Sequence, residues 1–178
     1  MVNFLYDYFH QEKFLVSLSS VSDNICEDDD KKYIDFDKFK EPQNCCNLTK
    51  GMNSLSSVDS LLINKDKNHI IFVEFKYMED LKDLKDVKEW FKNKECSIKI
   101  KIPDSILLLG YFLKENGYSF NDFIKMKKSF FYVYKNKSFK NTINNHLKGR
   151  FNKYDFLLEN TKIIEAQAYR NKFLKEQI

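Results

Sequence analysis

The stretch from Ser57 to Lys76 reads SVDSLLINKDKNHIIFVEFK. It contains two short apolar runs, which a polar connector at residues 64–69 separates. Runs rich in branched and aromatic residues on either side of a polar turn predict a β-hairpin. Nearly every position of the second run before its end is apolar, which predicts a strand that is covered on both faces.

The predicted hairpin carries charged residues where its strands begin and end. Asp59 opens the first run, and the second run closes on Glu74-Phe75-Lys76. Because side chains alternate along a strand, Glu74 and Lys76 are expected on one face and Phe75 on the other. A covered strand has no structural need to end in two charges on one face. We therefore interpret Asp59 and Glu74 as ligands of a cation, with Lys76 beside them, in a metal-dependent hydrolysis site.

A plainer interpretation of the same residues stays open. Glu74 and Lys76 can form an ordinary ion pair at a strand end, with Asp59 as a turn residue. Charged residues make up 31% of the chain, so an acid followed two residues later by a lysine also arises by chance. The apolar flanks and the amphipathic segment that follows favour the functional interpretation.

Composition predicts one globular domain over residues 1–178. The chain is 43% hydrophobic and 16% aromatic, which disfavours disorder. The net charge of +4 permits a polyanionic partner without requiring one. No signal peptide and no apolar run of about 20 residues is present, so we expect a cytoplasmic protein without a membrane span.

The cysteines and histidines do not predict a transition-metal site. No pair of cysteines has the spacing of a zinc or iron–sulfur motif, and reduced thiols are expected. The histidines are scattered. These residues are Cys26, Cys45, Cys46, Cys96, His10, His69 and His146.

Hydrophobic periodicity predicts the remaining elements. Helices are expected over 3–18, 79–95, 104–116 and 165–177, and a second buried strand over 129–135. Residues 33–40 fit a strand or a short helix, and residues 97–102 (SIKIKI) fit an edge strand or an extended connector before Pro103. Residues 19–30 and 43–56 are expected to be loops. The order predicts an α/β (α+β) fold, in which helices flank a central mixed β-sheet.

Two further segments have competing interpretations. The aromatic side chains of the 129–135 strand are expected in the core and not as base-stacking platforms; they are Phe130, Phe131, Tyr132 and Tyr134. The basic segment from Lys135 to Arg150 is either a surface that follows a phosphate backbone or a solvated loop.

Asp59, the hairpin turn and Glu74-Phe75-Lys76 together resemble the PD-(D/E)XK nuclease superfamily. The core VDSLLI…IFVEFK carries the resemblance, which covers about Ser57 to Leu84. It implies a restriction endonuclease-like fold and a DNA endonuclease. It also implies that Asp59, Glu74 and the Phe75 carbonyl hold Mg²⁺, for which Mn²⁺ can substitute, and that Lys76 assists the attacking water.

The sequence departs from this family at three points. Val58 stands where many members have a proline. The upstream acid is not identified, with Glu12 and Glu41 as candidates. A downstream basic or glutamine helper is unassigned. Small cap-snatching viral endonucleases use a similar core and add an upstream histidine, for which His10 is the only candidate.

Two classes of function follow. The first is a Mg²⁺-dependent endonuclease that acts on nucleic acid, most often DNA, as a monomer or a homodimer. The second is a non-catalytic module on the same fold that binds nucleic acid or a protein. The intact set of Asp59, Glu74 and Lys76 favours the enzyme.

Overall fold

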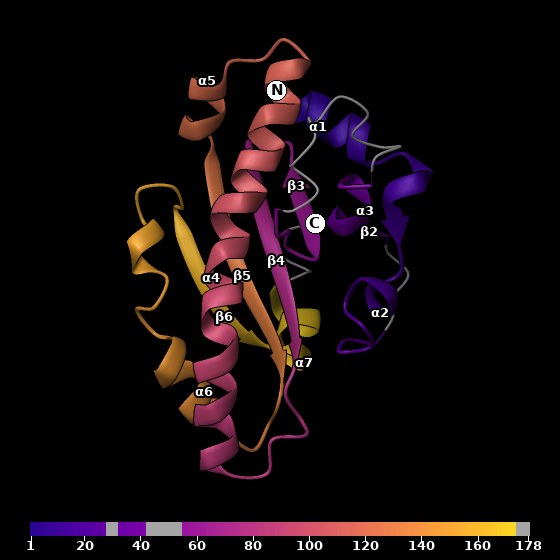
Figure 1. Cartoon of the computed structure of the whole chain (residues 1–178). Coiled ribbons are helices and arrows are strands. Elements are labelled where there is room, and N and C mark those ends of the chain that lie inside the picture. The colour runs from indigo at the N-terminus through magenta and orange to yellow at the C-terminus, as the bar shows by residue number, and fades with distance from the viewer. Residues whose placement is uncertain (28–31, 42–54, 174–178) are drawn as a thin grey trace.

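A six-stranded mixed sheet forms the centre of the computed structural model, which describes residues 1–27, 32–41 and 55–173 (Figure 1). The strands follow chain order across the sheet. The first four are antiparallel neighbours, whereas β4, β5 and β6 run parallel. Their bounds are β1 Leu15–Val16, β2 Tyr33–Asp35, β3 Ser60–Asn64, β4 His69–Tyr77, β5 Lys127–Lys135 and β6 Asn160–Glu165.

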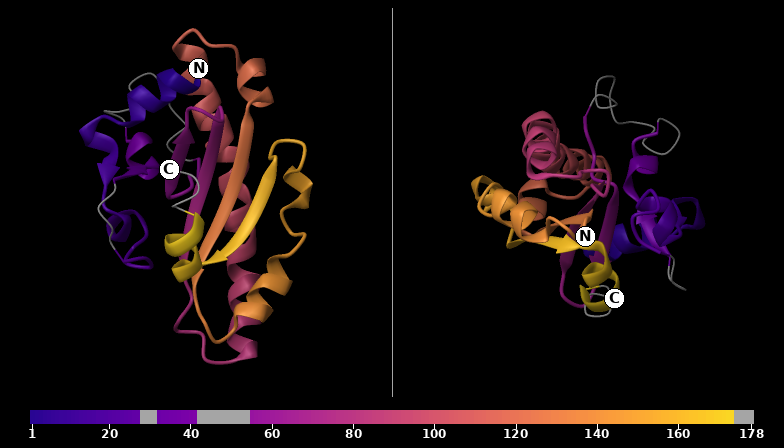
Figure 2. Two further views of the ribbon diagram at one scale, coloured as in Figure 1. Left: turned by 180° about the vertical axis from the view of Figure 1, so that it is seen from behind. Right: turned by 90° about the horizontal axis from the view of Figure 1, so that it is seen from below.

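Helices lie on both faces of this sheet. The long helix α4 crosses one face, with α6 beside its first turns, and α7 lies on the opposite face (Figures 1 and 2). This arrangement confirms the predicted fold class of a mixed sheet flanked by helices. The α-helices are α1 Val2–Phe9, α2 Leu18–Val21, α3 Phe36–Phe39, α4 Leu84–Glu115, α5 Phe120–Lys125, α6 Lys140–Leu147 and α7 Ala166–Ala168; shorter helical turns are η1 Glu12–Phe14, η3 Asn152–Tyr154 and η4 Tyr169–Phe173.

The predicted hairpin is confirmed as β3 and β4. The two strands pair from Ser60 opposite Val73 to Asn64 opposite His69. The Asn64 side chain accepts a hydrogen bond from the amide of Lys67 at 2.9 Å, which closes the turn. Because β4 also pairs with β5, its backbone has strand neighbours on both sides.

The side chains of β4 alternate between two hydrophobic clusters, as the sequence predicts. Ile70 and Phe72 pack on the α4 side, whereas Ile71, Val73 and Phe75 pack on the α7 side. The aromatic residues of β5 divide in the same way and are all buried, which confirms that they belong to the core. Glu74 therefore continues the α4-facing row and is itself fully buried.

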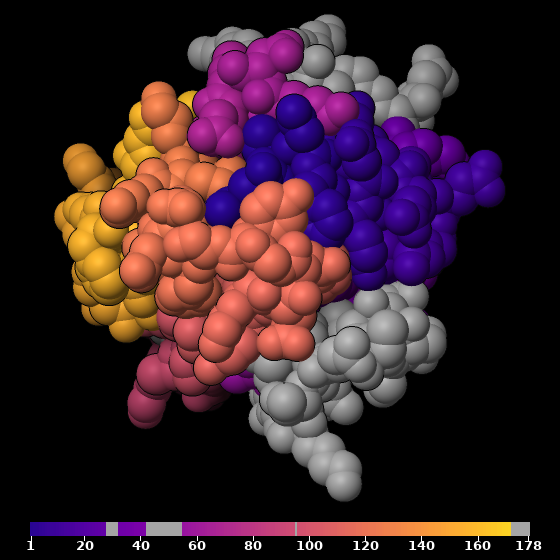
Figure 3. Space-filling view, turned by 90° about the horizontal axis from the view of Figure 1, so that it is seen from above, coloured from indigo at the N-terminus to yellow at the C-terminus, as the bar shows by residue number. Residues whose placement is uncertain are grey.

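The N-terminal helix is shorter than predicted. The expectation of a helix over 3–18 is wrong beyond Phe9, because Leu15 and Val16 pair with β2 as strand β1. The helical turn η1 between them buries Phe14. Viewed from above, α1 fills the space between the β3–β4 turn and the region where α4 gives way to α5 (Figure 3). Phe4 stacks there on Phe112 at 5.8 Å between ring centres.

Helix α4 contradicts the predicted strand or connector at 97–102. The helix runs without interruption from Leu84 to Glu115 and contains Pro103. A proline inside a helix leaves the carbonyl four residues earlier without its amide donor. Here that carbonyl belongs to Lys99, and it accepts a hydrogen bond from the Tyr154 hydroxyl at 2.7 Å. A tertiary contact thus supplies the donor that the proline lacks.

Several other boundaries differ from expectation. Residues 33–40 form both a strand and a short helix, because the Asp35 side chain caps α3 by accepting from the Lys38 amide at 3.1 Å. The basic segment after β5 contains α6, which buries Ile143 and Leu147. The predicted 165–177 helix is replaced by the end of β6, α7 and η4. The structure does not describe residues 28–31, 42–54 and 174–178, so most of the predicted loop over 43–56 lies outside the described residues.

Candidate functional site

Asp59 lies directly before β3, where the hairpin pairing brings it next to Glu74. The register of Ser60 opposite Val73 continues by one step to place Asp59 opposite Glu74. Oδ2 of Asp59 accepts a hydrogen bond from the Phe75 amide at 2.6 Å, and its backbone carbonyl accepts from the Phe36 amide at 3.0 Å. Both the side chain and the backbone of this acid are therefore held in place.

Helix α4 fixes the segment that leads into Asp59. The Asp104 carboxylate accepts from the Ser56 amide at 2.8 Å, and the Ser105 hydroxyl accepts from the Val58 amide at 2.9 Å. Ser105 is fully buried. These two bonds set the distance between Asp59 and the helix that passes over it.

Glu74 is the most enclosed charged group at this position. Its side chain has no exposed surface, and Oε1 lies within ion-pair distance of the ammonium groups of Lys76 and Lys101. Neither ammonium meets Oε1 with hydrogen-bond geometry, so this buried oxygen has ionic neighbours but no hydrogen bond. Oε2 accepts a hydrogen bond from Lys101 at 2.9 Å.

Lys76 extends from the same strand and face as Glu74, as predicted. Its ammonium forms an ion pair with Glu74 and donates to the Phe75 carbonyl at 2.9 Å. The Phe75 side chain points to the other face, where its ring packs edge-on against Tyr169 at 5.7 Å between ring centres. The structure thus brings together all four groups that the sequence singles out: two carboxylates, one carbonyl and one ammonium.

Lys101 is a member of this cluster that the sequence pattern did not predict. Its ammonium lies 3.1 Å from Asp59 Oδ1 and 2.8 Å from Glu74 Oε1. It comes from the middle of α4, in the stretch that the sequence predicted as an edge strand or connector. The spacing of Ile98, Ile102 and Ile106, four residues apart and all buried, was the signal for a helix that would have placed Lys101 over the sheet.

The electrostatics of the cluster are those of two crowded acids. Burial, followed by the charge of Asp59, raises the pKa of Glu74 to about 7 against the opposing effect of Lys76 and Lys101. Burial lowers the pKa of Lys101, but the charges of Glu74 and Asp59 more than offset it, so the net pKa is raised. Burial and the same two acids also raise the pKa of Tyr132, which pairs with Glu74 across β4 and β5.

The donor set fits a hard divalent cation. Two carboxylates and a carbonyl are oxygen ligands, and three protein oxygens leave coordination places for water, as Mg²⁺ prefers. The buried Oε1 of Glu74 accepts no hydrogen bond, so a cation would replace only its ion pairs with Lys76 and Lys101. Within the described residues, no group of three or more His, Cys, Asp or Glu side chains gathers as a metal site. Any metal held here would depend on Asp59, Glu74 and the Phe75 carbonyl.

The candidate upstream residues do not join this cluster. Glu12 is exposed in η1 and Glu41 is exposed after α3, and neither is among the contacts of Asp59 or Glu74. His10 donates from Nδ1 to the Tyr6 carbonyl at 2.8 Å and stacks on the Tyr6 ring at 3.6 Å between ring centres. It has a local role at the end of α1.

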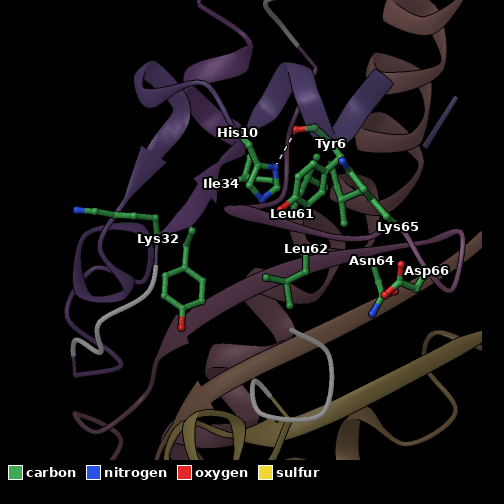
Figure 4. A pocket seen from close by; sticks show the side chains of 11 residues that line it. Tyr6, His10, Lys32, Ile34, Leu61, Leu62, Asn64, Lys65 and Asp66 are labelled. Atoms are coloured by element: carbon green, nitrogen blue, oxygen red, sulfur yellow. Dashed lines mark hydrogen bonds between the residues drawn. The ribbon is translucent and has the colours of Figure 1, made fainter. Parts of the chain in front are cut away.

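His10 instead lines a cavity of about 270 Å³ beside β2 and β3 (Figure 4). The Lys65 ammonium lies 3.9 Å from the centre of the Tyr6 ring there, so that ring is flanked by His10 and Lys65. Burial, followed by the charge of Lys65, lowers the pKa of His10 despite its bond to the carbonyl of Tyr6. None of the cluster residues Asp59, Glu74, Lys76 or Lys101 lines this cavity.

A second cavity of about 260 Å³ lies at the carboxyl ends of the parallel strands. Its lining includes Lys135 at the end of β5 and Glu165 at the end of β6. Cys26 also lines it, and burial raises the pKa of this thiol to about 12, which makes it unreactive. The acid–lysine cluster does not contribute to this cavity either.

Comparisons with known proteins give no assignment: the chain matches no protein-family model, no curated protein and no solved structure. In the part of the chain that the structure describes, no helix has the length and apolar character needed to span a membrane. The resemblance to the PD-(D/E)XK superfamily therefore stays a prediction, and the geometry of the cluster carries the functional argument.

Proposed function

We propose that this protein is a metal-dependent nuclease that hydrolyses phosphodiester bonds. The observation that carries the proposal is the meeting of Asp59, Glu74 and Lys76 near the end of β4. Two neighbouring carboxylates, one of them fully buried, repel each other, and a protein keeps such a pair where charge chemistry needs it. The presence of the Phe75 carbonyl beside them supports an oxygen-ligand cation site.

Each residue has a defined task in this proposal. Asp59 and Glu74 hold the cation, with the Phe75 carbonyl as a third oxygen, and Mg²⁺ or Mn²⁺ fits this set. When bound, the cation supplies Lewis-acid stabilisation of the phosphate charge and a more acidic water. Lys76 donates from the edge of the cluster, where its ammonium can stabilise negative charge on an attacking water or on phosphate. Its bond to the Phe75 carbonyl fixes its orientation.

The substrate in this proposal is nucleic acid, with DNA favoured, and the compartment is the cytoplasm. The net charge of +4 supports a polyanionic partner. Exposed lysines lie on α6 and the turn that follows it, including Lys140 and Lys148. These lysines support contact between a phosphate backbone and the surface of α6.

A second function is favoured by one observation. Lys101 contacts both acids, so the cluster is already neutralised by the protein's own lysines. A closed network of this kind can have a purely structural role, in which it joins α4 to the sheet. The protein would then be a non-catalytic module that binds nucleic acid or a protein partner.

A cleavage assay separates the two functions. Supercoiled plasmid, single-stranded DNA and RNA are each incubated with the protein and Mg²⁺, Mn²⁺ or EDTA. The Glu74→Gln variant keeps the shape of the side chain and removes its charge, and Glu89→Gln, an exposed position on α4, is the matched control. Metal-dependent cleavage that Glu74→Gln reduces at least about 100-fold and Glu89→Gln retains supports the nuclease. Equal cleavage by both variants, or none by the wild type, rules the proposal out.

A further inference from the structure

We propose that Lys101 is an internal counter-ion that occupies the cation position, so that a divalent metal must displace it in order to bind. This inference rests on the proposed metal site and concerns how that site is regulated. Three carboxylate oxygens surround the Lys101 ammonium group. The Lys101 ammonium lies 3.1 Å from Asp59 Oδ1, and 2.8 Å and 2.9 Å from the two oxygens of Glu74.

Lys76 does not hold the same position. Its ammonium contacts Glu74 and the Phe75 carbonyl, but it has no contact with Asp59. Among the described residues, Lys101 alone bridges the two acids, and bridging both acids is also the task of the proposed cation. A Mg²⁺ ion lies about 2.0–2.1 Å from its oxygen ligands. An ion bound by both carboxylates therefore needs the space that the Lys101 ammonium fills, and the two positive charges repel each other.

The surroundings of Lys101 allow it to leave. Its side chain is 21% exposed, whereas Glu74 has no exposed surface. Within the described part of the chain, its hydrogen bonds run to the two acids alone, so displacement breaks no other contact of its ammonium there. The helix backbone need not move, because a lysine stem has four rotatable bonds. The acids are fixed by β3 and β4, and the competing cation is the mobile member.

This arrangement has two consequences for the metal-free protein. The acid pair stays neutralised without metal, which keeps the hairpin end and α4 together. Metal affinity is lowered by the free energy of displacing the ammonium, so the site fills only at higher metal concentration. Lys101 thus sets the threshold at which the proposed enzyme becomes loaded.

The test measures metal binding and does not depend on cleavage. Mn²⁺ is titrated by calorimetry into the wild type, Lys101→Met and Lys101→Gln, with Lys92→Met as the control. Lys92 is an exposed lysine on the same helix, so its replacement changes the net charge equally. Both Lys101 variants are expected to bind Mn²⁺ at least tenfold more tightly than the wild type, and Lys92→Met is expected to bind as the wild type does.

Every other outcome is decisive as well. Unchanged or weaker binding by the Lys101 variants overturns the inference and leaves the metal site itself standing. Absence of Mn²⁺ binding in all four proteins overturns the inference together with the metal site. If the Lys101 variants are unfolded without metal, circular dichroism with Mn²⁺ decides: metal-dependent folding supports the displacement, and an unfolded chain in both conditions refutes it. Failure of the wild type to cut nucleic acid while it binds Mn²⁺ would reject the nuclease alone.

Discussion

Two lysines of this protein, Lys101 partly buried and Lys128 fully buried, have opposite surroundings. Lys101 lies between two carboxylates, and their charges raise its pKa despite burial. Lys128 on β5 has no exposed surface and donates to the carbonyls of Ile124 and Met126 at 2.9 Å and 2.8 Å. Burial lowers the pKa of Lys128 to about 8.

The comparison separates two ways of holding a buried ammonium. Carbonyl oxygens at the end of α5 satisfy the hydrogen bonds of Lys128 but supply no opposite charge. Asp59 and Glu74 supply Lys101 with hydrogen-bond acceptors and with opposite charge. Because these two acids are crowded together, they require a cation there. Lys128 is therefore explained by local structure, as the group that closes the end of α5, whereas Lys101 belongs to a site.

The largest expected effect comes from replacing Lys101 in the metal-free protein. Lys101→Met leaves Glu74 buried with Lys76 as its remaining cation, and removal of one partner of a buried ion pair is strongly destabilising. Because Lys101 is partly exposed, we expect a loss of about 2–3 kcal/mol in the free energy of unfolding. Urea denaturation at pH 7 with EDTA measures it. Lys128→Met should change this free energy by less than about 1 kcal/mol, because loss of two hydrogen bonds offsets removal of an unpaired charge. A larger loss for Lys128→Met would reverse the comparison.

Glu74 gives a pH-dependent test of the crowded acids. Its folded pKa of about 7 lies above the ordinary value of 4.5, so the folded state binds more protons between these pH values. The stability of the wild type should therefore fall as pH rises from about 4.5 to 7, by about 2 kcal/mol relative to Glu74→Gln. Thermal unfolding of both proteins at pH 4.5 and pH 7.5 measures the difference. A constant difference across this range would show that Glu74 does not titrate between those values.

The contribution of Lys128 should make stability rise with pH, the opposite of the Glu74 effect, and it should do so at alkaline pH. Its folded pKa of about 8 lies below the ordinary value of 10.5, so the unfolded state binds more protons between these values. Wild-type stability should therefore rise relative to Lys128→Met as pH increases from about 8 to 10.5, by about 2 kcal/mol. Denaturant unfolding at pH 7.5 and pH 10 tests the sign. Parallel curves for the two proteins would mean that the carbonyl bonds hold the ammonium without any pKa shift.

The smallest expected effect concerns the contact that keeps α4 helical near Lys101. Tyr154→Phe removes the donor to the Lys99 carbonyl and should lower the free energy of unfolding by about 1 kcal/mol. In a Pro103→Ala background, the new amide of residue 103 can donate to that carbonyl, so the same change should have almost no effect. The four proteins form a double-mutant cycle. Equal losses in both backgrounds would show that Tyr154 acts elsewhere.

The sequence predicted the part of the site that depends on local pairing. The hairpin, the opposite faces of Glu74 and Phe75 and the approach of Asp59 all follow from strand alternation and one short turn. The position of Lys101 over the two acids was not predicted, because SIKIKI alternates with the period of a strand and a proline such as Pro103 usually ends a helix. The four-residue spacing of Ile98, Ile102 and Ile106 was the competing signal for a helix. The donor that lets the helix pass Pro103 comes from Tyr154, 55 residues from Lys99 in the chain, and local pattern does not contain it. The early end of α1 likewise depends on pairing between β1 and β2.

The parallel pairing of β4 and β5 also determines the order in which the cluster assembles during folding. Asp59 and Phe75 are 16 residues apart and meet when a single hairpin closes, whereas Lys101 is 42 residues from Asp59 and arrives only with the crossover helix. Contacts between near residues form earlier, because their loop-closure entropy is smaller. The chain therefore brings its two carboxylates together, with Lys76 beside Glu74, before Lys101 arrives. The slow step of refolding should then be the docking of α4 on the sheet.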